Sequence, residues 1–224
     1  MRLITGFAAP LLAAVALGTG APAGDEFSDP SLAGWQTMSG DIGDGGATTW
    51  VVKNGQLVVH VAQSSWVNAQ HAFYLWKTVD GDFDLSARVL TTGEHSRLAG
   101  DGWSLAGLLV RDPLAAGTPK EQWLNWSVGR VRGRNVFEAK TTQDGESHLS
   151  LLSAKPVWVD LRVVRHGATF KLYRRYAGRR WTEAWHFVRP DLGSELQVGV
   201  DAQSGFGMAA DLVAHVDWVH FASP

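Results

Sequence analysis

The chain has 224 residues, with 20 Lys and Arg against 22 Asp and Glu, so its formal net charge is −2 at pH 7 with histidine neutral. Nucleic acid is therefore not an expected partner, because neutralising phosphates requires a basic surface. There is no cysteine, which excludes disulfides, thiol catalysis and cysteine-ligated metals, and a chain of about 200 residues buries enough surface to fold without them.

The chain begins with the segment order that is typical of a secretory signal peptide. Arg2 precedes an apolar stretch at residues 7–17, and a small-residue stretch follows that ends in Ala21-Pro22-Ala23. This order predicts a signal peptide over residues 1–23 and a protein that is secreted or periplasmic. The apolar stretch is shorter than the roughly 20 residues of a bilayer span. We therefore expect no membrane span after cleavage, and a signal that stays attached as an anchor is the alternative.

Residues 24–224 are predicted to form a single domain, since they contain no repeat and no linker long enough to divide them. The first strong local signal is Asn54-Gly55, which separates the two apolar runs within residues 49–60. Asn-Gly supplies the positive φ angles of a type I′ turn, so this stretch predicts a β-hairpin.

Strand signals continue along the rest of the chain. From Asp82 to Val89 apolar and polar residues alternate strictly, with Arg88 on the polar face, as expected for an antiparallel strand with one face in water. Further strands are expected at residues 104–111, 123–130, 135–141, 147–152, 157–165, 169–176, 183–188, 196–202 and 209–221. No helical period is sustained anywhere. The pattern predicts an all-β fold, a two-sheet antiparallel β-sandwich of the jelly-roll type.

Four motifs resemble one known superfamily. They lie at residues 81–89, 106–112, 158–167 (with Phe170 and Tyr173) and 198–202. The chain resembles the laminin-G-like jelly rolls of the concanavalin A-like lectin/glucanase superfamily, and more narrowly the bacterial branch that includes regulation-of-enolase-like proteins. The resemblance covers roughly residues 27–221. It implies the jelly-roll fold but not the activity, because the superfamily contains lectins, glycosidases, lyases and adhesion modules.

Catalysis is not expected from the acidic residues. Glucanases of that superfamily carry Glu-x-Asp-x-x-Glu on one strand, which projects two carboxylates to the same face, and this sequence has no such triplet. Glu138 is the best isolated candidate, and a surface ion pair with Lys140 is its simpler explanation. The enzyme alternative is a glycoside hydrolase or polysaccharide lyase in which Glu138 acts with Arg111, or with a tyrosine such as Tyr74 or Tyr173.

A carbohydrate-binding face is predicted on the polar side of the middle strands. Its guanidinium and amide donors, carboxylate acceptor and indole ring are the groups that a sugar-binding surface requires. The expected ligand-binding residues are Arg88, Arg111, Trp123, Asn125 and Glu138, with Trp103 from a loop. An equal alternative is a solvent-exposed sheet with cross-strand charge pairs. The sequence therefore predicts a monomeric, non-catalytic, lectin-like protein whose partner is a polysaccharide or glycan, with a cell-surface protein-interaction module as a third possibility.

The chain has 11 tryptophans against three tyrosines, and indole rings serve both core packing and sugar stacking. Six lie among apolar strand neighbours and are expected in the core: Trp50, Trp76, Trp126, Trp158, Trp185 and Trp218. Trp66, Trp103 and Trp181 lie in or beside polar loops, where an exposed ring would indicate a ligand. Residues 174–181 contain four arginines around a turn, which would either attract an anionic polysaccharide or be solvated.

No cofactor and no catalytic metal is expected. A structural calcium ion is the minority alternative, because jelly-roll modules often join their first and last strands through a metal. Asp25, Glu26 and Asp217 supply hard oxygen ligands near those ends of the chain. The other interpretation of Asp217 is that it accepts hydrogen bonds from turn amides.

Overall fold

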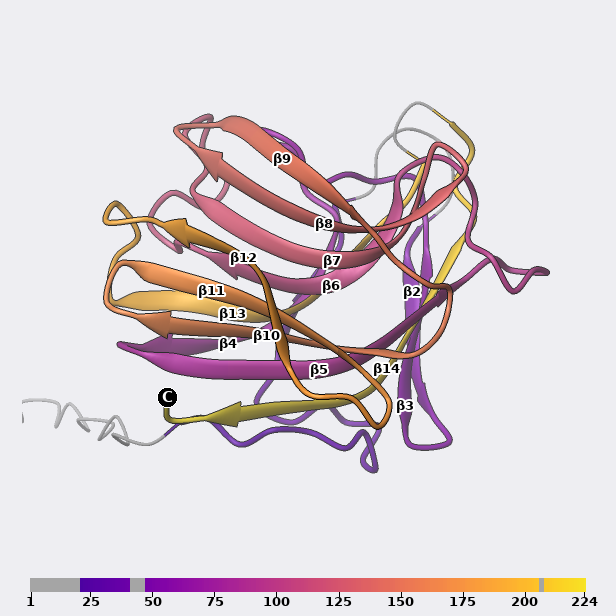
Figure 1. Ribbon diagram of the computed structural model, residues 1–224, viewed down its shortest axis with the longest axis horizontal. Helices are drawn as coiled ribbons and strands as arrows, with labels where there is room; N and C mark the ends of the chain where they lie inside the picture. The colour runs from indigo at the N-terminus through magenta and orange to yellow at the C-terminus, as the bar shows by residue number, and fades with distance from the viewer. Residues whose placement is uncertain (1–20, 41–46, 206–207) are drawn as a thin grey trace, which may run out of the picture.

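The computed structural model describes residues 21–40, 47–205 and 208–224. These residues form 14 strands in two antiparallel sheets of seven strands each, with no helix among them (Figure 1). Most of the predicted signal peptide, residues 1–20, lies outside the described residues. Within the described ranges, nothing helical has the length and hydropathy that a membrane crossing needs.

Each sheet brings together strands that are distant in the sequence. Sheet 1 contains, in spatial order, β1 (Gln36–Met38), β4 (Phe73–Asp80), β13 (Glu195–Gln203), β6 (Ser104–Arg111), β7 (Trp123–Val131), β8 (Arg134–Gln143) and β9 (Glu146–Ser153). Sheet 2 contains β12 (Thr182–Val188), β11 (Thr169–Tyr176), β10 (Val159–His166), β5 (Phe83–Thr92), β14 (Leu212–Ala222), β3 (Gln56–Val61) and β2 (Thr49–Lys53). The predicted two-sheet antiparallel sandwich is confirmed.

The predicted strands agree with the observed ones to within a few residues. The Asn54-Gly55 turn joins β2 to β3, and both residues have the positive φ that the sequence required, 55° and 72°. The last strand begins at Leu212, three residues later than expected. Strand β4 was not predicted, because its first four residues are all buried and give no polar alternation.

The two sheets differ in what their outer faces contact, and this difference positions the site. Strand β5 of sheet 2 alternates strictly between buried and half-buried residues, so one face packs inward and one faces solvent. Every residue of β6 in sheet 1 is buried. The centre of sheet 1 is therefore covered on both faces, by the shared core on one side and by another part of the chain on the other, whereas its edge strand β9 has exposed residues.

The core lies between the sheets and consists of apolar side chains from both. Trp126 of β7 stacks on Phe137 of β8, with ring centroids 5.3 Å apart, and both are fully buried. Phe83 of β5 and Phe170 of β11 approach from the other sheet, with centroids 6.3 Å apart. Aromatic pairs at such distances add to the stabilisation from the buried area itself.

Candidate functional site

Most of the residues predicted to bind a ligand share one face of sheet 1. Arg111 of β6 lies opposite Trp123 of β7, and Asn125 and Glu138 follow on the same face of β7 and β8. The intervening Leu124 belongs to the core. The alternation therefore placed these four side chains correctly relative to one another, on the outer face of sheet 1.

This outer face is closed by residues 62–72, called the Trp66 segment from this point on. The backbone amide of Trp66 donates a hydrogen bond to Oε1 of Gln203 at 2.7 Å, and its carbonyl accepts one from Nζ of Lys140 at 2.9 Å. Its ring meets that of Trp123 edge to face, with centroids 5.8 Å apart. The exposed fractions beneath the segment are 0% for Trp123, Asn125 and Glu138 and 4% for Arg111. The expected solvent exposure of this face is wrong, and a binding role for these residues requires the segment to move.

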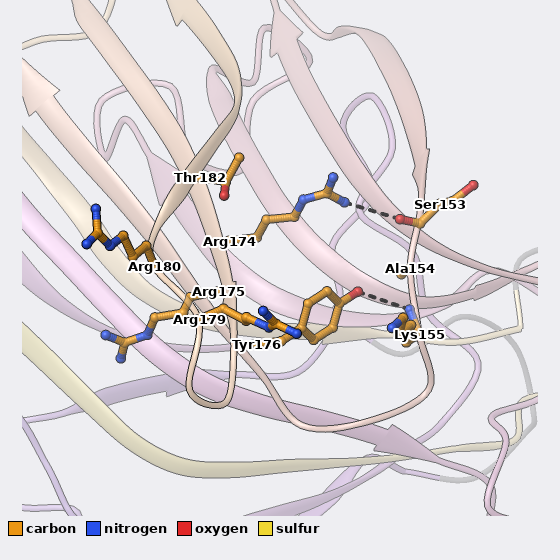
Figure 2. Close-up of a pocket in the computed structure, with 9 residues that line it drawn as sticks. All are labelled: Ser153, Ala154, Lys155, Arg174, Arg175, Tyr176, Arg179, Arg180 and Thr182. Carbon is orange, nitrogen blue, oxygen red and sulfur yellow. Dashed lines mark hydrogen bonds between the residues drawn. The ribbon is translucent and has the colours of Figure 1, made fainter.

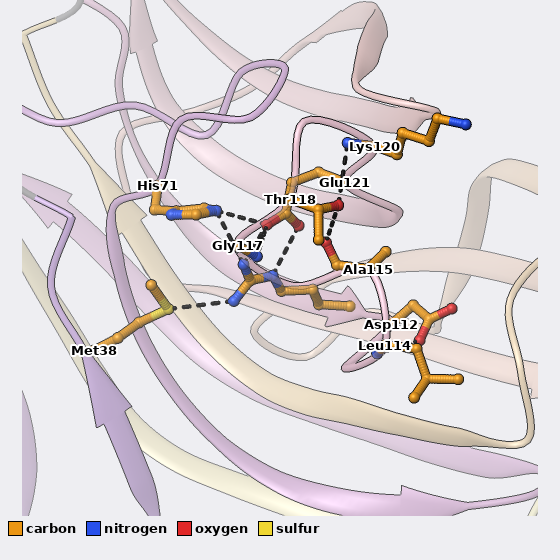
Figure 3. Close-up of polar contacts among 10 residues, drawn as sticks. Met38, His71, Asp112, Leu114, Ala115, Gly117, Thr118, Lys120 and Glu121 are labelled. Carbon is orange, nitrogen blue, oxygen red and sulfur yellow. Dashed lines mark hydrogen bonds and ion pairs between the residues drawn. The ribbon is translucent and has the colours of Figure 1, made fainter.

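Arg111 belongs to a closed ion-pair network. Its Nε donates to Oε2 of Glu121 at 2.9 Å, and its Nη2 lies 2.9 Å from Nε2 of His71 (Figure 3). Glu121 also contacts His71 at 2.7 Å and accepts a 2.6 Å hydrogen bond from the backbone amide of Gly117. Burial raises the pKa of Glu121, but the bonds from His71 and Arg111 outweigh it and lower that pKa to about 2. Arg111 is therefore already paired within the fold, with the carboxylate of Glu121.

Glu138 and Lys140 form the expected ion pair, 2.6 Å apart, but the pair is buried and the expectation of a surface pair is wrong. Desolvation raises the pKa of Glu138 despite the neighbouring lysine charge. Nearby, Asn125 donates to Oδ1 of Asp201 at 2.8 Å. Burial raises the pKa of Asp201 to about 8, so this carboxyl is mostly protonated at pH 7.

Several polar atoms of this buried group have no hydrogen-bond partner among the described residues. They are Oε2 of Glu138, Oδ2 of Asp201, Oδ1 of Asn125 and Oγ of Ser127. Unpaired buried polar atoms are costly and uncommon. Beneath the Trp66 segment the molecule therefore holds a polar group that is only partly satisfied.

The remaining two predicted residues lie in different places. Trp103, in the loop before β6, is half-buried, and its ring centroid is 5.8 Å from Nζ of Lys140, so it joins the buried group. Arg88 lies in β5 of sheet 2, which pairs with β10 and β14 and not with β6, so its expected place beside Arg111 is wrong. Alternation gives the face of a strand but not the sheet to which the strand belongs.

Around Arg88 the outer face of sheet 2 carries the group of side chains that we call the Arg/Trp face. Its members are Arg88, Asp160, Arg162, Arg175, Trp181 and Trp218. One cross-strand row runs from Trp218 through Arg88 and Asp160 to Arg175. Neighbouring strands thus bring together residues that are up to 130 positions apart in the chain.

The arginines of this face are held by carboxylates and by indole rings. Asp160 accepts from Nε of Arg88 at 2.7 Å and from Nε of Arg175 at 2.8 Å. The guanidinium carbon of Arg175 lies 4.3 Å from the ring centroid of Trp181, and that of Arg88 lies 5.6 Å from that of Trp218. These distances are within the range of cation–π attraction. The face is therefore ordered before any ligand arrives.

The Arg/Trp face is hollowed and open to solvent. One depression of about 530 Å³ lies between Arg88, Arg162, Trp181 and Trp218. A smaller one of about 240 Å³, which includes Trp158, adjoins it and shares Arg88. Both the donors and the rings line the same hollows.

Trp158 and Trp218 were expected in the core, and the structure places both on this half-buried outer face. For Trp218 the cause is a β-bulge between Val216 and Trp218, which reverses the inward and outward alternation within β14. Asp160 and Arg162 were not singled out, although they alternate on the expected strand at residues 157–165. Trp66, at which an exposed ring would have indicated a ligand, is fully buried.

The three proposed calcium ligands do not converge. The carboxylate of Asp25 accepts from the amide of Phe27 and the indole of Trp35. Glu26 contacts His220, and Asp217 lies 3.8 Å from Arg88. No cluster of three or more His, Asp or Glu side chains suited to a metal ion occurs in the ranges that the structure describes. These donors do not fit a shared calcium ion.

Comparison with known proteins gives the fold. No family model matches the chain, and no curated protein matches it. The GH43 protein BlXynB from Bacillus licheniformis is similar over 96% of this chain and 41% of its own, with a TM-score of 0.71 and 14% identity. A functionally unknown protein from Saccharomyces cerevisiae is similar over 86% of this chain and 98% of its own, with a TM-score of 0.64 and 15% identity.

A third similar structure is Rv0315 of Mycobacterium tuberculosis, described as an immunostimulatory antigen and pseudo β-1,3-glucanase. It matches 92% of this chain and 99% of its own, with a TM-score of 0.58 and 14% identity. The chain thus spans about two fifths of the GH43 protein and nearly all of the other two. These likenesses show the concanavalin A-like jelly-roll fold.

Proposed function

We propose that this protein binds carbohydrate without cleaving it, and that the Arg/Trp face is the binding site. The observation that carries this proposal is the open depression of about 530 Å³ lined by Arg88, Arg162, Arg175, Trp181 and Trp218. It transfers the predicted lectin-like function from the outer face of sheet 1, which the Trp66 segment closes, to the outer face of sheet 2. Of the residues expected from the sequence, Arg88 is retained.

The chemistry of the face suits a sugar. The C–H face of a pyranose ring packs on an indole, while its hydroxyls need donors and acceptors at the rim. Trp181 and Trp218 supply the rings, and the paired groups Arg162 and Asp84 supply donors and acceptors, with Nε and Oδ1 2.7 Å apart. Since the ion pairs already hold these side chains, little conformational entropy is lost when a ligand binds.

The similar structures support a carbohydrate context. BlXynB is a GH43 protein and Rv0315 is described as a pseudo β-1,3-glucanase. We also propose that the chain is related to the regulation-of-enolase-like branch, and that residues 1–23 direct its export. They rest on the sequence motifs at residues 81–89 and 158–167 and on the segment order of the N-terminus.

A non-catalytic role is supported by the state of the carboxylates on the face. Asp84 is bound by Arg162, and Asp160 is bound by both Arg88 and Arg175. A glycosidase instead needs one carboxyl that can donate a proton to the leaving group and a second that acts as nucleophile or base. Because they are paired with arginine, these carboxylates act as hydrogen-bond acceptors and not as proton donors.

A second candidate function is glycoside hydrolysis beneath the Trp66 segment. Asp201 and Glu138 lie in one cross-strand row through Gly107 and Ser127. Burial raises the pKa of both carboxyls, to about 8 for Asp201, which is the property of a general acid. This function requires displacement of the Trp66 segment to admit a sugar.

The test is affinity gel electrophoresis of the full chain through a panel of neutral and acidic polysaccharides, with reducing-sugar and unsaturated-product release measured in parallel. We expect retardation by at least one polysaccharide without product. Trp218→Ala should abolish most of the retardation, whereas Trp50→Ala should not. Trp50 is a suitable control because it is 38% exposed on β2, at the opposite edge of sheet 2 from β11 and β12.

Three results would overturn the proposal. Equal loss of retardation in Trp50→Ala and Trp218→Ala would show that the Arg/Trp face is not the site. Product release would favour the buried carboxyl pair and hydrolysis. The absence of any retardation would leave the cell-surface protein-interaction module as the remaining possibility.

A further inference from the structure

Beside the two depressions of the Arg/Trp face lies a third, of about 590 Å³, where the end of β11 meets the connection between β9 and β10 (Figure 2). Five of its nine lining residues are cations, and none is acidic: Lys155, Arg174, Arg175, Arg179 and Arg180. We call this depression the basic cleft.

The positive charge of the basic cleft is largely uncompensated. Of the five cations, Arg175 is paired with a carboxylate, that of Asp160, and the other four have no carboxylate within ion-pair distance in the part of the chain that the structure describes. The whole chain carries a net charge of −2. Local accumulation of one sign in a depression raises the concentration of oppositely charged ligands there.

Part of the basic cleft is held in place by the fold. Arg174 donates from Nη1 to the carbonyl of Ser153 at 3.2 Å, and its guanidinium lies 4.8 Å from the ring centroid of Phe137. The hydroxyl of Tyr176 accepts a 3.1 Å hydrogen bond from the backbone amide of Lys155 (Figure 2). These contacts hold the guanidinium of Arg174 and the backbone of Lys155 in place.

Arg179 and Arg180 are presented by the turn between β11 and β12. Arg179 closes this turn with a 3.0 Å hydrogen bond from its amide to the carbonyl of Tyr176, and Gly178 within the turn has a φ of 70°. Both arginine side chains are exposed. They are therefore free to contact a ligand that lies in the cleft.

The basic cleft adjoins the Arg/Trp face. Arg175 lines both depressions, and the Trp181 ring against it lines the larger hollow of the Arg/Trp face. A glycan stacked on Trp181 would therefore place its neighbouring units beside Arg179 and Arg180. A ligand that occupies both depressions has to be extended.

We propose that the glycan is an anionic polysaccharide whose carboxylate or sulfate groups lie in the basic cleft while a sugar ring lies on the Arg/Trp face. This inference rests on the proposed function and names its ligand class. Guanidinium groups bind carboxylate and sulfate oxygens through two parallel hydrogen bonds, and three of the arginines that line the cleft, Arg174, Arg179 and Arg180, have no carboxylate within ion-pair distance among the described residues. The indole rings distinguish a glycan from a simple polyanion, because a pyranose offers a C–H face for stacking.

The test measures affinity of the full chain for polygalacturonate, dextran sulfate, neutral dextran and xylan, and single-stranded DNA. We expect tighter binding of one or both anionic glycans than of the neutral ones. Binding of the anionic glycans should weaken about tenfold between about 50 mM and about 500 mM NaCl, since salt screens exposed charges. Polygalacturonate and dextran sulfate distinguish a carboxylate-binding cleft from one for sulfate.

The discriminating variant is Arg179→Gln combined with Arg180→Gln. It should weaken anionic glycan binding about tenfold, because two exposed charge contacts are lost, and leave neutral glycans unaffected. The matched control is Arg97→Gln combined with Lys120→Gln, which removes the same charge from exposed positions outside the cleft. Trp218→Ala should weaken the binding of every glycan that the parent protein binds.

The outcomes separate this inference from the proposed function. Salt-independent binding of neutral and anionic glycans with equal affinity, unchanged in the double arginine variant, would overturn the inference and leave the proposed function standing. Failure of all glycans to bind would overturn both. DNA binding as tight as that of the anionic glycans, and insensitive to Trp218→Ala, would replace the glycan with a general polyanion.

Discussion

Trp66 and Gln203 lie in contact, with the backbone amide of Trp66 donating to Oε1 of Gln203 at 2.7 Å. This bond attaches the loop between β3 and β4 to the outer face of β13. As a result sheet 1 has no solvent-facing surface at its centre, and the open face of the molecule belongs to sheet 2.

Replacing Trp66 tests that closure. The ring is 0% exposed and contacts His71, Tyr74 and Trp123, so Trp66→Ala should destabilise the fold by about 3–5 kcal/mol. Urea unfolding measures the loss, and quenching of tryptophan fluorescence by acrylamide should rise as Trp123 becomes accessible. A loss below about 1 kcal/mol, with quenching unchanged, would mean that the segment does not seal the face.

The raised pKa of Asp201 predicts how stability depends on pH. Its pKa rises from 3.8 to about 8 on folding, so the native state holds a proton that the unfolded state releases. The contribution of Asp201 to stability is complete below pH 3.8 and is lost as pH rises toward 8, by up to about 1.4 kcal/mol per pH unit.

Asp201→Asn should remove that part of the pH dependence, since the amide is neutral throughout. We expect the variant to match the parent near pH 4 and to be more stable than the parent near pH 8, measured by thermal unfolding across pH. Equal slopes of stability against pH in the two proteins would contradict a raised pKa at this carboxyl.

Glu121 has the opposite behaviour. Its folded pKa is about 2 and its ordinary value is 4.5, so its contribution to stability is present above pH 4.5 and is lost as pH falls toward 2. Glu121→Gln leaves Arg111 buried without its carboxylate, at a cost of about 3–5 kcal/mol near pH 7. The measured difference between parent and variant should shrink as the solution is acidified below pH 4.5, and a constant difference would argue against the ion pair.

Two glycines separate backbone strain from steric conflict. Gly55 has a φ of 72°, and an added methyl carbon would meet only the carbonyl oxygen of Glu26 at 4.0 Å, so Gly55→Ala should cost about 1–2 kcal/mol from conformation alone. At Gly107 the added carbon would lie 2.2 Å from the carbonyl oxygen of Trp126, so Gly107→Ala should cost more. Chemical denaturation of both variants compares the two costs, and the reverse order would contradict the packing of β6 against β7.

The fold was largely predictable because its evidence is local. Alternation at Asp82–Val89 gave β5, and Asn54-Gly55 gave the turn between β2 and β3. Strand β4 was missed because a strand covered on both faces shows no alternation: Phe73 and Leu75 belong to the core between the sheets, and Tyr74 and Trp76 pack with Trp66 on the other face. The missing alternation of apolar and polar residues in β4 is therefore a consequence of the tertiary structure.

The candidate site was predictable only in part. Alternation correctly grouped Arg111 with Trp123 and identified Arg88 as outward-facing. It could not show that a loop covers the first pair, or that Arg88 belongs to the other sheet. The bulge in β14 also moved Trp218 from the expected inner face to the outer one, and one extra residue in a strand leaves no reliable mark on the sequence.

The sequence by itself determined the strands other than β1 and β4, the turn geometry and the polar side of the regularly alternating strands, because these depend on neighbouring residues and on the two-residue period of a strand. Tertiary structure alone decided which polar face meets solvent. That outcome depends on strand pairing and loop packing between residues such as Trp66 and Gln203, which are 137 positions apart. The contact between Arg88 and Trp218 on the open face of sheet 2 was decided in the same way, by the pairing of β5 with β14.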